Sequence, residues 1–333
     1  MRLIGARVEL NNLLIMNPDS AVRLVLYEPK YKAAWDEFVR QSKNGVFLFY
    51  RDYLEYHADR FRDFSMLFFQ GEQLVALMPA NRDEEALVSH AGLTFGGIIS
   101  DRRMTTTRML RVFSALLEHL RTQGIQRLIY KAIPHMYHSV PAEEDLYALF
   151  VNNARLFRRD VSSTVFVDER LPLVRNRRKT LKHAQQLGLQ VERSQDFLRF
   201  MTIGKTNLET RHGVKPVHTG EEVQSLAERF PENIKLFTVS RGEQMLGGVL
   251  IYESRNVAHG QYRFATEDGM KIGALDFVMD VLLNDVYREK RYVDFGISTV
   301  DNGRTLNIGL IRNKEAYGAR ATVYDSYELS LKP

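Results

Sequence analysis

Residues 257–298 constrain the fold of this chain more than any other stretch, because they predict a strand, a glycine-containing loop, a helix and a second strand. Apolar residues follow the loop at spacings of three and four, which is the pattern of a helix with one buried face. They are Ala274, Phe277, Val278, Val281, Leu282 and Val286. A helix between two strands usually joins them in parallel through a right-handed crossover. We therefore expect an α/β (α+β) fold with a mixed sheet.

The loop before this helix contains Gly269, Lys271 and Gly273. It leads into the helix N-terminus, where free backbone N–H groups and the helix dipole favour negative charge. An anionic group, such as the pyrophosphate of a cofactor, would bind well there. These three residues are therefore candidate cofactor-binding residues.

The first strand carries a polar residue at every second position. Strict alternation places His259, Gln261 and Arg263 on one face. Burying such a face beside a crossover helix is unfavourable unless the face lines a wet cleft. The pattern favours a cleft, with Gln261 and Arg263 as further cofactor contacts. The alternative is the exposed face of an antiparallel strand.

The same order of elements occurs earlier in the chain. The early copy consists of a hairpin at Gly71, a strand over residues 86–95, a helix over Thr106–Thr122 and a strand over residues 125–133. Its His90 corresponds to His259 at nearly the same offset as Gly71 corresponds to Gly242. We therefore predict two tandem domains of one plan, residues 1–168 and 169–333, each with a mixed sheet and a crossover helix. Strands are also expected over residues 6–10 and 319–329, the latter closing the second sheet.

A basic linker helix is predicted over residues 172–187, starting at Pro172. Its charged residues are Arg175, Arg177, Arg178, Lys179 and Lys182. Charge runs of this kind usually form a solvated helix face. The alternative is an arm that contacts phosphate groups.

Composition and motifs exclude several classes. The chain has 333 residues and no cysteine, which rules out disulfides and thiolate catalysis. No G-x-S-x-G, P-loop or H-E-x-x-H motif is present, so a hydrolase elbow, a nucleotide-binding P-loop and a metal site are not expected. The net charge of +5 suits an anionic ligand but does not imply DNA binding. The charged N-terminus and the lack of a long apolar run predict a cytoplasmic protein without a membrane-spanning segment.

Several stretches together resemble a known family, the GNAT acyltransferases, and within it the tandem FemAB/FemX-like branch. They are NGVFLFYRDYLEYHADRFRD from Asn44, SHAGLTFGG from Ser89, YKAIPHMYH from Tyr130, NLETRHGVKPVH from Asn207, AHGQYRFA from Ala258, DFGISTVDNGRTLN from Asp294 and KEAYG from Lys314. The last resembles the K-x-G-F segment of Fem proteins, with Ala316 in place of a glycine. Residues 266–274 match the coenzyme-A loop of ordinary GNAT proteins only loosely.

The resemblance implies an N-acyltransferase. Its donor would be an acyl-CoA, with acetyl-CoA preferred, and its acceptor an amino group of a sugar nucleotide or cell-envelope precursor. His259 and Asp294, on the two strands beside the crossover helix, are candidate catalytic residues, and either a histidine or a carboxylate could be the general base. The alternative for Asp294 is a strand-end cap. Lys314 is the candidate cation for the donor phosphate or the reacting carbonyl; the alternative is a surface ion pair with Glu315. The other functions in view are an aminoacyl-tRNA-dependent transferase acting on a peptidoglycan precursor and a non-catalytic binding module.

The acceptor pocket is predicted at the end of the first domain's return strand, since ligands gather at such strand ends. The predicted lining, shared with the second domain, is His90, Lys131, His135, Tyr137, Asn207, Arg211 and His212. The alternative is a polar loop without a binding role. The sequence does not predict an oligomeric state.

Overall fold

The computed structural model describes residues 21–213 and 216–332, so the strand predicted over residues 6–10 lies outside the described residues. The chain divides into two units, residues 1–158 with 324–333, and residues 159–323. The first unit therefore ends before the predicted boundary at residue 168, and it includes the last strand of the chain. Each unit is described by itself below.

The first unit contains the sheet β1-β3-β4-β7 and a run of paired strands, β17-β8-β6-β5-β2, in which β17 is Arg320–Ser330. Its strands are β1 (Val22–Leu26), β2 (Arg62–Asp63), β3 (Met66–Gln70), β4 (Gln73–Met78), β5 (Asn81–Asp83), β6 (Ala86–Val88), β7 (Ile99–Ser100) and β8 (Arg127–Lys131). Its helices are α2 (Lys32–Gln41), α3 (Arg51–Leu54), α4 (Thr106–Thr122) and α5 (Glu144–Val151). Parallel strands β6 and β8 are joined through α4, as predicted, and the apolar face of α4 is buried in the core of the unit.

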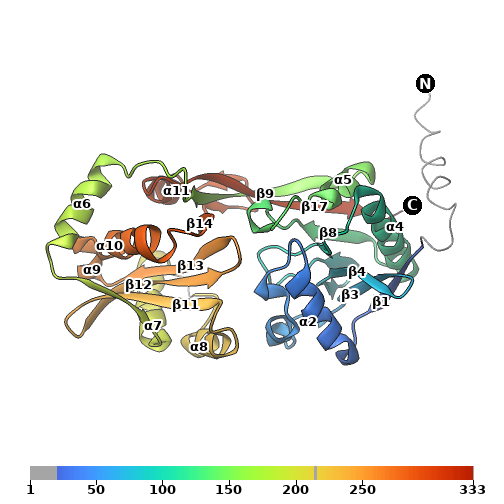
Figure 1. Ribbon diagram of the computed structural model, residues 1–333, viewed down its shortest axis with the longest axis horizontal. Helices are drawn as coiled ribbons and strands as arrows, with labels where there is room; N and C mark the ends of the chain where they lie inside the picture. The colour runs from blue at the N-terminus through green and yellow to red at the C-terminus, as the bar shows by residue number, and fades with distance from the viewer. Residues whose placement is uncertain (1–20, 214–215, 333) are drawn as a thin grey trace, which may run out of the picture. The chain divides into compact units, whose positions relative to one another are not determined.

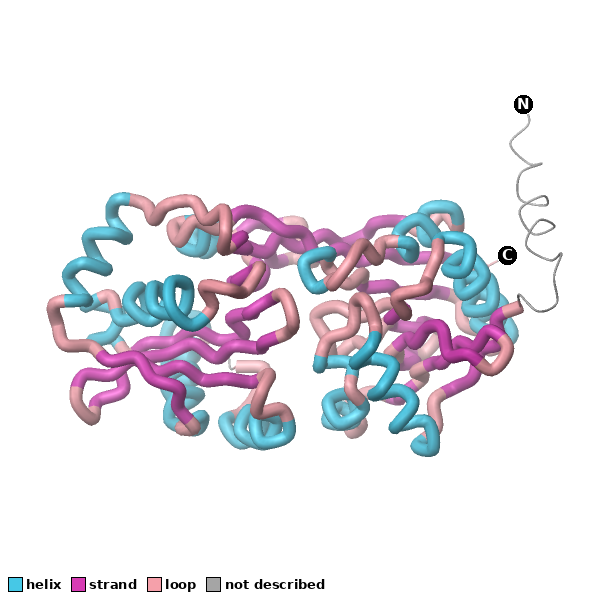
Figure 2. Tube along the Cα trace, viewed as in Figure 1, coloured by secondary structure: helices cyan, strands magenta, loops and turns pink. Residues whose placement is uncertain are grey.

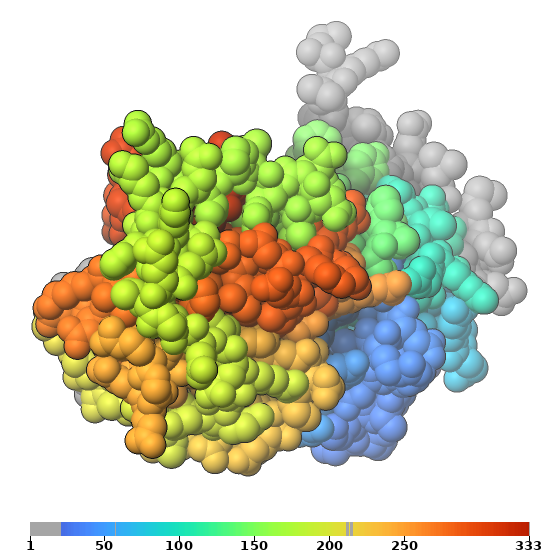
Figure 3. All heavy atoms as spheres, turned by 60° about the vertical axis from the view of Figure 1, so that its left-hand side comes forward, coloured from blue at the N-terminus to red at the C-terminus, as the bar shows by residue number. Residues whose placement is uncertain are grey.

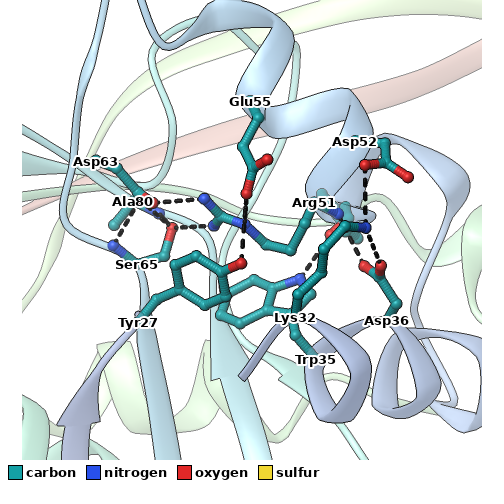
Figure 4. A network of polar contacts seen from close by, with 11 residues as sticks. Tyr27, Lys32, Trp35, Asp36, Arg51, Asp52, Glu55, Asp63, Ser65 and Ala80 are labelled. Atoms are coloured by element: carbon teal, nitrogen blue, oxygen red, sulfur yellow. Dashed lines mark hydrogen bonds and ion pairs between the residues drawn. The ribbon is translucent and has the colours of Figure 1, made fainter. Parts of the chain in front are cut away.

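Helices α2 and α3 are fastened to the strands of this unit by Arg51 (Figure 4). The buried guanidinium donates to Asp63 Oδ2 at 2.5 Å and to Ser65 Oγ at 3.2 Å, and it lies 3.6 Å from the centre of the Tyr27 ring. The Arg51 backbone N–H also donates to Asp36 Oδ1 at 2.8 Å. Since every polar end of Arg51 is used inside the unit, we assign this network a structural role.

The second unit has one sheet, ordered β10-β11-β12-β13-β14-β9. Its strands are β9 (Arg155–Phe166), β10 (Gln190–Ser194), β11 (Ile234–Arg241), β12 (Gln244–Glu253), β13 (Val257–Ala265) and β14 (Tyr292–Ile297). Its helices are α6 (Arg175–Gln185), α7 (Phe197–His212), α8 (Gly220–Arg229), α9 (Glu267–Ile272), α10 (Ala274–Val281) and α11 (Ile308–Glu315), with a short hairpin, β15 (Thr299–Val300) and β16 (Thr305–Leu306). Helices α9 and α10 cover one face of this sheet and α7 and α8 the other (Figures 1 and 2).

Four local predictions are wrong, each for a physical reason. The strand predicted over residues 86–95 ends at Val88, because the backbone turns at His90, which has a φ of 55°. The basic helix starts at Arg175 rather than Pro172. The loop with Gly269 and Gly273 is itself a helix, α9, whose N-terminus is capped by the Thr266 side chain.

The fourth concerns the predicted apolar stripe of α10. A π-helical turn, Leu282–Val286, follows this helix and adds a residue to one turn. The extra residue rotates the buried face, so Leu283 and Tyr287 are buried while Val286 is 43 % exposed.

The last strand, β17 (Arg320–Ser330), does not close the second sheet as predicted. Its residues Ser326–Ser330 pair in antiparallel fashion with Lys131–Arg127 of β8, in the first unit. In turn, β9 leaves the first unit and pairs with β14 in the second, with Thr164 opposite Asp294. Both β9 and β17 thus run along the chain from one unit into the other.

Candidate active site in the second unit

The parallel strands β13 and β14 separate soon after they meet. They pair only through Val257–His259 and Tyr292–Asp294, although β13 continues to Ala265 and β14 to Ile297 (Figure 1). Beyond His259 and Asp294 the two strands no longer bond each other. The last paired residues, His259 and Asp294, thus lie at the point where the sheet opens.

His259 and Asp294 form a hydrogen-bonded pair at this opening. The imidazole Nδ1 lies 2.7 Å from Asp294 Oδ2, and the His259 side chain keeps 18 % of its surface exposed. A carboxylate can only accept, so Nδ1 carries the proton and Nε2 keeps its lone pair. The pair can therefore accept a proton from a group bound at the opening.

Asp294 is buried and held by several donors. Ser162 Oγ and Thr164 Oγ1, both from β9, donate to Oδ1 at 2.6 and 2.8 Å, and the Gly296 N–H donates to Oδ2 at 3.2 Å. Burial by itself would raise the pKa of Asp294, but the hydrogen bonds and the charge of His259 bring this pKa below its usual value. The carboxylate stays ionised and fixes the orientation of His259.

Lys314, on α11, reaches the same end of β14. Its Nζ donates to the backbone carbonyls of Gly296 and Ile297 at 2.8 and 2.7 Å, and only 5 % of the residue is exposed. Burial, together with repulsion from Arg263, lowers the pKa of Lys314 to about 8, against the attraction of Asp294. The alternative of a surface ion pair with Glu315 is therefore wrong.

Comparisons with known proteins agree with this geometry. Residues 173–303 match the family model of the acetyltransferase (GNAT) domain. The second unit is a GNAT acyltransferase domain. The fold of the whole chain is similar to that of FemX, with a TM-score of 0.63, 10 % identity and coverage of 92 % of this chain and 97 % of FemX. It is also similar to L-PGS from Bacillus licheniformis, with a TM-score of 0.58, 13 % identity and 92 % coverage of both chains.

At these identities the likeness establishes the tandem-GNAT fold of the FemX type and nothing about substrates. The sequence matches none of the curated proteins with which it was compared. Among the described residues, no helix has both the length and the apolar composition needed to cross a membrane. In the same part of the chain, no group of three or more histidine or acidic side chains is placed to hold a metal ion.

The predicted polar face of β13 in this GNAT domain is wrong. A β-bulge opposite Leu250 and Ile251 adds one residue to β13, so that His259 pairs with Tyr252 and Arg263 with Val249. Directly opposed residues in an antiparallel pair share a face, and Tyr252 and Val249 lie on opposite faces of β12. His259 and Arg263 therefore point to opposite faces, with Gln261 at the bulge between them.

The three residues predicted from the loop of this domain have separate surroundings. Gly269 is buried in α9, where its N–H donates to Thr266 Oγ1 and a Cβ would lie 2.2 Å from the Leu246 carbonyl oxygen. Lys271 is 64 % exposed and pairs with Glu267 at 2.8 Å. Gly273, with a φ of 77°, joins α9 to α10, and a Cβ there would collide with Thr180 of α6. Figure 3 shows α6 in yellow-green lying on the orange surface of these helices.

In the first unit, the structure places Lys131 beside the loop that follows β6. Its Nζ donates to the Leu93 and Ala91 carbonyls, the latter at 3.5 Å, and burial with nearby Arg158 lowers the pKa of Lys131 to about 7. His90, in the same loop, is buried with its ring edge-on to Phe61 at 5.6 Å.

Tyr137 and His135 lie beyond the end of β8, on one 3₁₀ turn. Tyr137 is buried with its ring 4.5 Å from that of Phe95, whereas His135 is exposed. Tyr137 thus contacts the loop that follows β6 through Phe95. Of the two residues, only His135 faces solvent.

The remaining predicted residues lie on α7 of the second unit. Asn207 Nδ2 donates to the Ala265 carbonyl at 2.7 Å and so fastens the end of β13. Arg211 and His212 belong to the last turn of this helix, and their side chains lie outside the described part of the chain. A pocket shared between the two units stays a prediction.

Sequence reasoning missed Ser162 and Thr164, the residues that hold Asp294. The only signal was a run of small hydroxyl residues, Ser162–Thr164, between Val161 and Val165. It also missed Asn313 and the pairing of Arg177 with Asp276, which connects α6 to α10. These contacts join segments far apart in sequence, and local patterns do not encode them.

Proposed function

We propose that the second unit transfers an acyl group from an acyl-CoA, preferably acetyl-CoA, to a primary amine of a sugar nucleotide or cell-envelope precursor. The observation that carries the proposal is the His259–Asp294 pair at the opening between β13 and β14, with Lys314 held at the end of β14. A base, a fixed carboxylate and a nearby cation are the groups that acyl transfer to an amine requires.

In this proposal the amine nitrogen attacks the thioester carbonyl carbon while its proton passes to His259 Nε2. Asp294 stabilises the imidazolium that results, because its carboxylate already accepts the Nδ1 proton. Lys314 stabilises the negative charge that develops on the carbonyl oxygen. The carbon–sulfur bond then breaks, and the departing thiolate takes the proton back from His259, which returns the site to its starting state.

The opening in the second unit suits an extended donor. Where β13 and β14 separate, each strand presents a backbone edge that the other no longer uses, and an amide-containing arm can bond to such edges. Gln261, Lys271 and Gly273 remain the candidate donor contacts beyond it. Gly269 is the weakest of the predicted set because its N–H already has an acceptor.

The first unit differs from the second at the corresponding pair of strands, and this difference supports placing the donor in the second unit. Its parallel strands β6 and β8 pair as far as Val88 and Ile129. Beyond these residues, the loop that follows β6 forms the hydrogen bonds to β8. The Gly96 N–H donates to the Lys131 carbonyl at 2.9 Å, and a Cβ at Gly97 would lie 2.7 Å from the Tyr130 ring. The corresponding opening is filled by the chain itself, so we place the donor in the second unit and leave Lys131, His135 and Tyr137 as acceptor candidates.

An aminoacyl-tRNA donor is the second candidate. One observation favours it: α6 exposes a row of basic side chains, Arg175, Arg178, Lys179 and Lys182. Contacts of this kind to RNA phosphates would make binding weaken steeply with salt. Filter binding of aminoacyl-tRNA that is unchanged between low and physiological salt would reject this donor.

The test of the leading proposal has two parts. Acetyl-CoA at about 100 times its dissociation constant should stabilise the full chain by roughly 2.7 kcal/mol in a thermal-shift assay. Release of free CoA should then be followed with a panel of amino sugars, sugar nucleotides and peptide amines. Asp294→Asn should slow the release by about a hundredfold or more, while Asp301→Asn, in an exposed turn, should not change it. A wild-type chain that binds no acyl-CoA would remove the donor assignment.

A further inference from the structure

Arg263 crosses the opening on the face of the sheet opposite His259. Its Nη2 donates to Asn313 Oδ1 of α11 at 3.0 Å. The guanidinium carbon lies 5.1 Å from the centre of the Phe295 ring and 5.5 Å from that of Tyr317, and these two rings stack on each other at 5.3 Å. The aromatic rings and Asn313 hold the guanidinium in one orientation, and of its nitrogens only Nη2 donates in these contacts.

One of those remaining groups has no acceptor. Arg263 Nη1 is buried and has no hydrogen-bond partner in the described part of the chain. A buried donor without an acceptor is unfavourable by about 1–3 kcal/mol, and more when the group is charged. An orphaned charged donor of this kind indicates a missing acceptor rather than a structural contact.

The charges around Arg263 lead to the same conclusion. The neighbouring cation Arg177 is neutralised by an ion pair with Asp276, which also accepts from the Tyr317 hydroxyl at 2.6 Å. Asp294 is occupied by His259 and its hydroxyl donors. In the described residues, Arg263 and Lys314 are thus left without a carboxylate in ion-pair contact. Arg177, Arg263 and Lys314 thus face two carboxylates, Asp276 and Asp294, which leaves an excess of one positive charge around the opening.

We propose that Arg263 is an oxyanion-binding residue that recognises a phosphate group of the acyl donor. The planar guanidinium, oriented by its stacking, binds phosphate oxygens through two in-plane N–H groups. The identity of the phosphate's carrier rests on the proposed function, since acyl-CoA and aminoacyl-tRNA both carry phosphates. The oxyanion site itself does not depend on that choice.

The experiment compares ligands with and without phosphate. Affinities of coenzyme A, pantetheine and inorganic pyrophosphate are measured by calorimetry on the full chain and on Arg263→Gln, Arg263→Lys and Arg288→Gln. Pantetheine shares the thiol arm of coenzyme A but has no phosphate. Arg263→Gln should weaken coenzyme A and pyrophosphate about tenfold to a hundredfold and leave pantetheine unchanged. Arg288→Gln, at an exposed arginine outside both candidate sites, should leave all three affinities unchanged.

The outcomes separate this proposal from the proposed function. Equal weakening of coenzyme A and pantetheine in Arg263→Gln would overturn it, because the loss would then not depend on phosphate. Binding of pyrophosphate through Arg263 without binding of coenzyme A would support the oxyanion site and refute the acyl-CoA donor. If Arg263→Gln does not fold, Arg263→Lys decides, since it keeps the charge and loses the planar pair of donors. Wild-type affinity of Arg263→Lys for pyrophosphate would overturn the proposal.

Discussion

The burial of Lys314 has a measurable consequence for stability. Lys314 is 5 % exposed, and its pKa is lowered to about 8 from the ordinary 10.5 of lysine. Between these two values the unfolded chain binds a proton that the folded chain does not. Stability therefore rises with pH across this window, and the charged form destabilises the folded protein below pH 8.

The size of the effect follows from the two pKa values. Each pH unit of difference corresponds to about 1.4 kcal/mol, so the folded protein gains about 3 kcal/mol between pH 8 and 10.5 from this one group. Lys314→Met removes the titration. It also removes the bonds to the Gly296 and Ile297 carbonyls, but that loss adds an offset that hardly changes with pH.

The assay is urea unfolding of wild type and Lys314→Met, followed by circular dichroism, from pH 7.5 to 10.5. The stability of the variant relative to wild type should fall by about 3 kcal/mol across this range. Lys271→Met, at an exposed lysine, is the control and should run parallel to wild type. Parallel profiles for Lys314→Met would refute the reasoning. If the Lys314 ammonium acts on the oxyanion, turnover of the wild type should also fall as pH rises above about 8.

Two further predictions concern buried charges in the same unit. Asp294→Asn should lower turnover by about a hundredfold or more, because His259 loses its fixed orientation and the stabilising charge. The measurement is a pH–rate profile of the variant and of the wild type. A variant with wild-type turnover would contradict this prediction. Arg177→Gln leaves the buried carboxylate of Asp276 without its partner and should destabilise the unit by about 3–5 kcal/mol, whereas Arg178→Gln, exposed on the same helix, should change stability by less than about 0.5 kcal/mol. Urea unfolding measures both, and equal midpoints would show that the pair contributes nothing.

Strong periodicity made the regular elements predictable. The helix Thr106–Thr122 was confirmed to the residue, and its apolar face is buried, because an amphipathic stripe depends only on local spacing. The crossover order of the second unit was confirmed for the same reason, and it brought His259 and Asp294 together at the end of the parallel pairing. Their catalytic roles remain predictions.

Single-residue insertions into a strand and a helix made the periodicity predictions wrong after the insertion. The bulge in β13 reverses the faces of all residues after Gln261, and the π-helical turn after α10 exchanges Val286 for Leu283 and Tyr287 in the core. Each adds one residue to a regular period, and a pattern of apolar residues carries no signal for such an insertion. The misplacement of Arg263, the residue on which the oxyanion site depends, follows directly from the bulge.

The two copies share an order of elements, but residues at corresponding positions do not have the same surroundings. His90 was expected to match His259, since both were predicted to lie in the strand that leads to the crossover helix, at nearly the same offset as the two hairpins. In the first unit that strand ends at Val88, and the following loop bonds to β8 through Ser89 and Gly96, so its histidine sits in a turn beyond the paired strands. In the second unit β13 continues past His259, although its pairing with β14 ends there. The same order of elements thus ends in a loop that bonds to β8 in one copy and in a strand that continues past its parallel pairing in the other, and this difference is the reason that we assign the proposed donor site to the second unit.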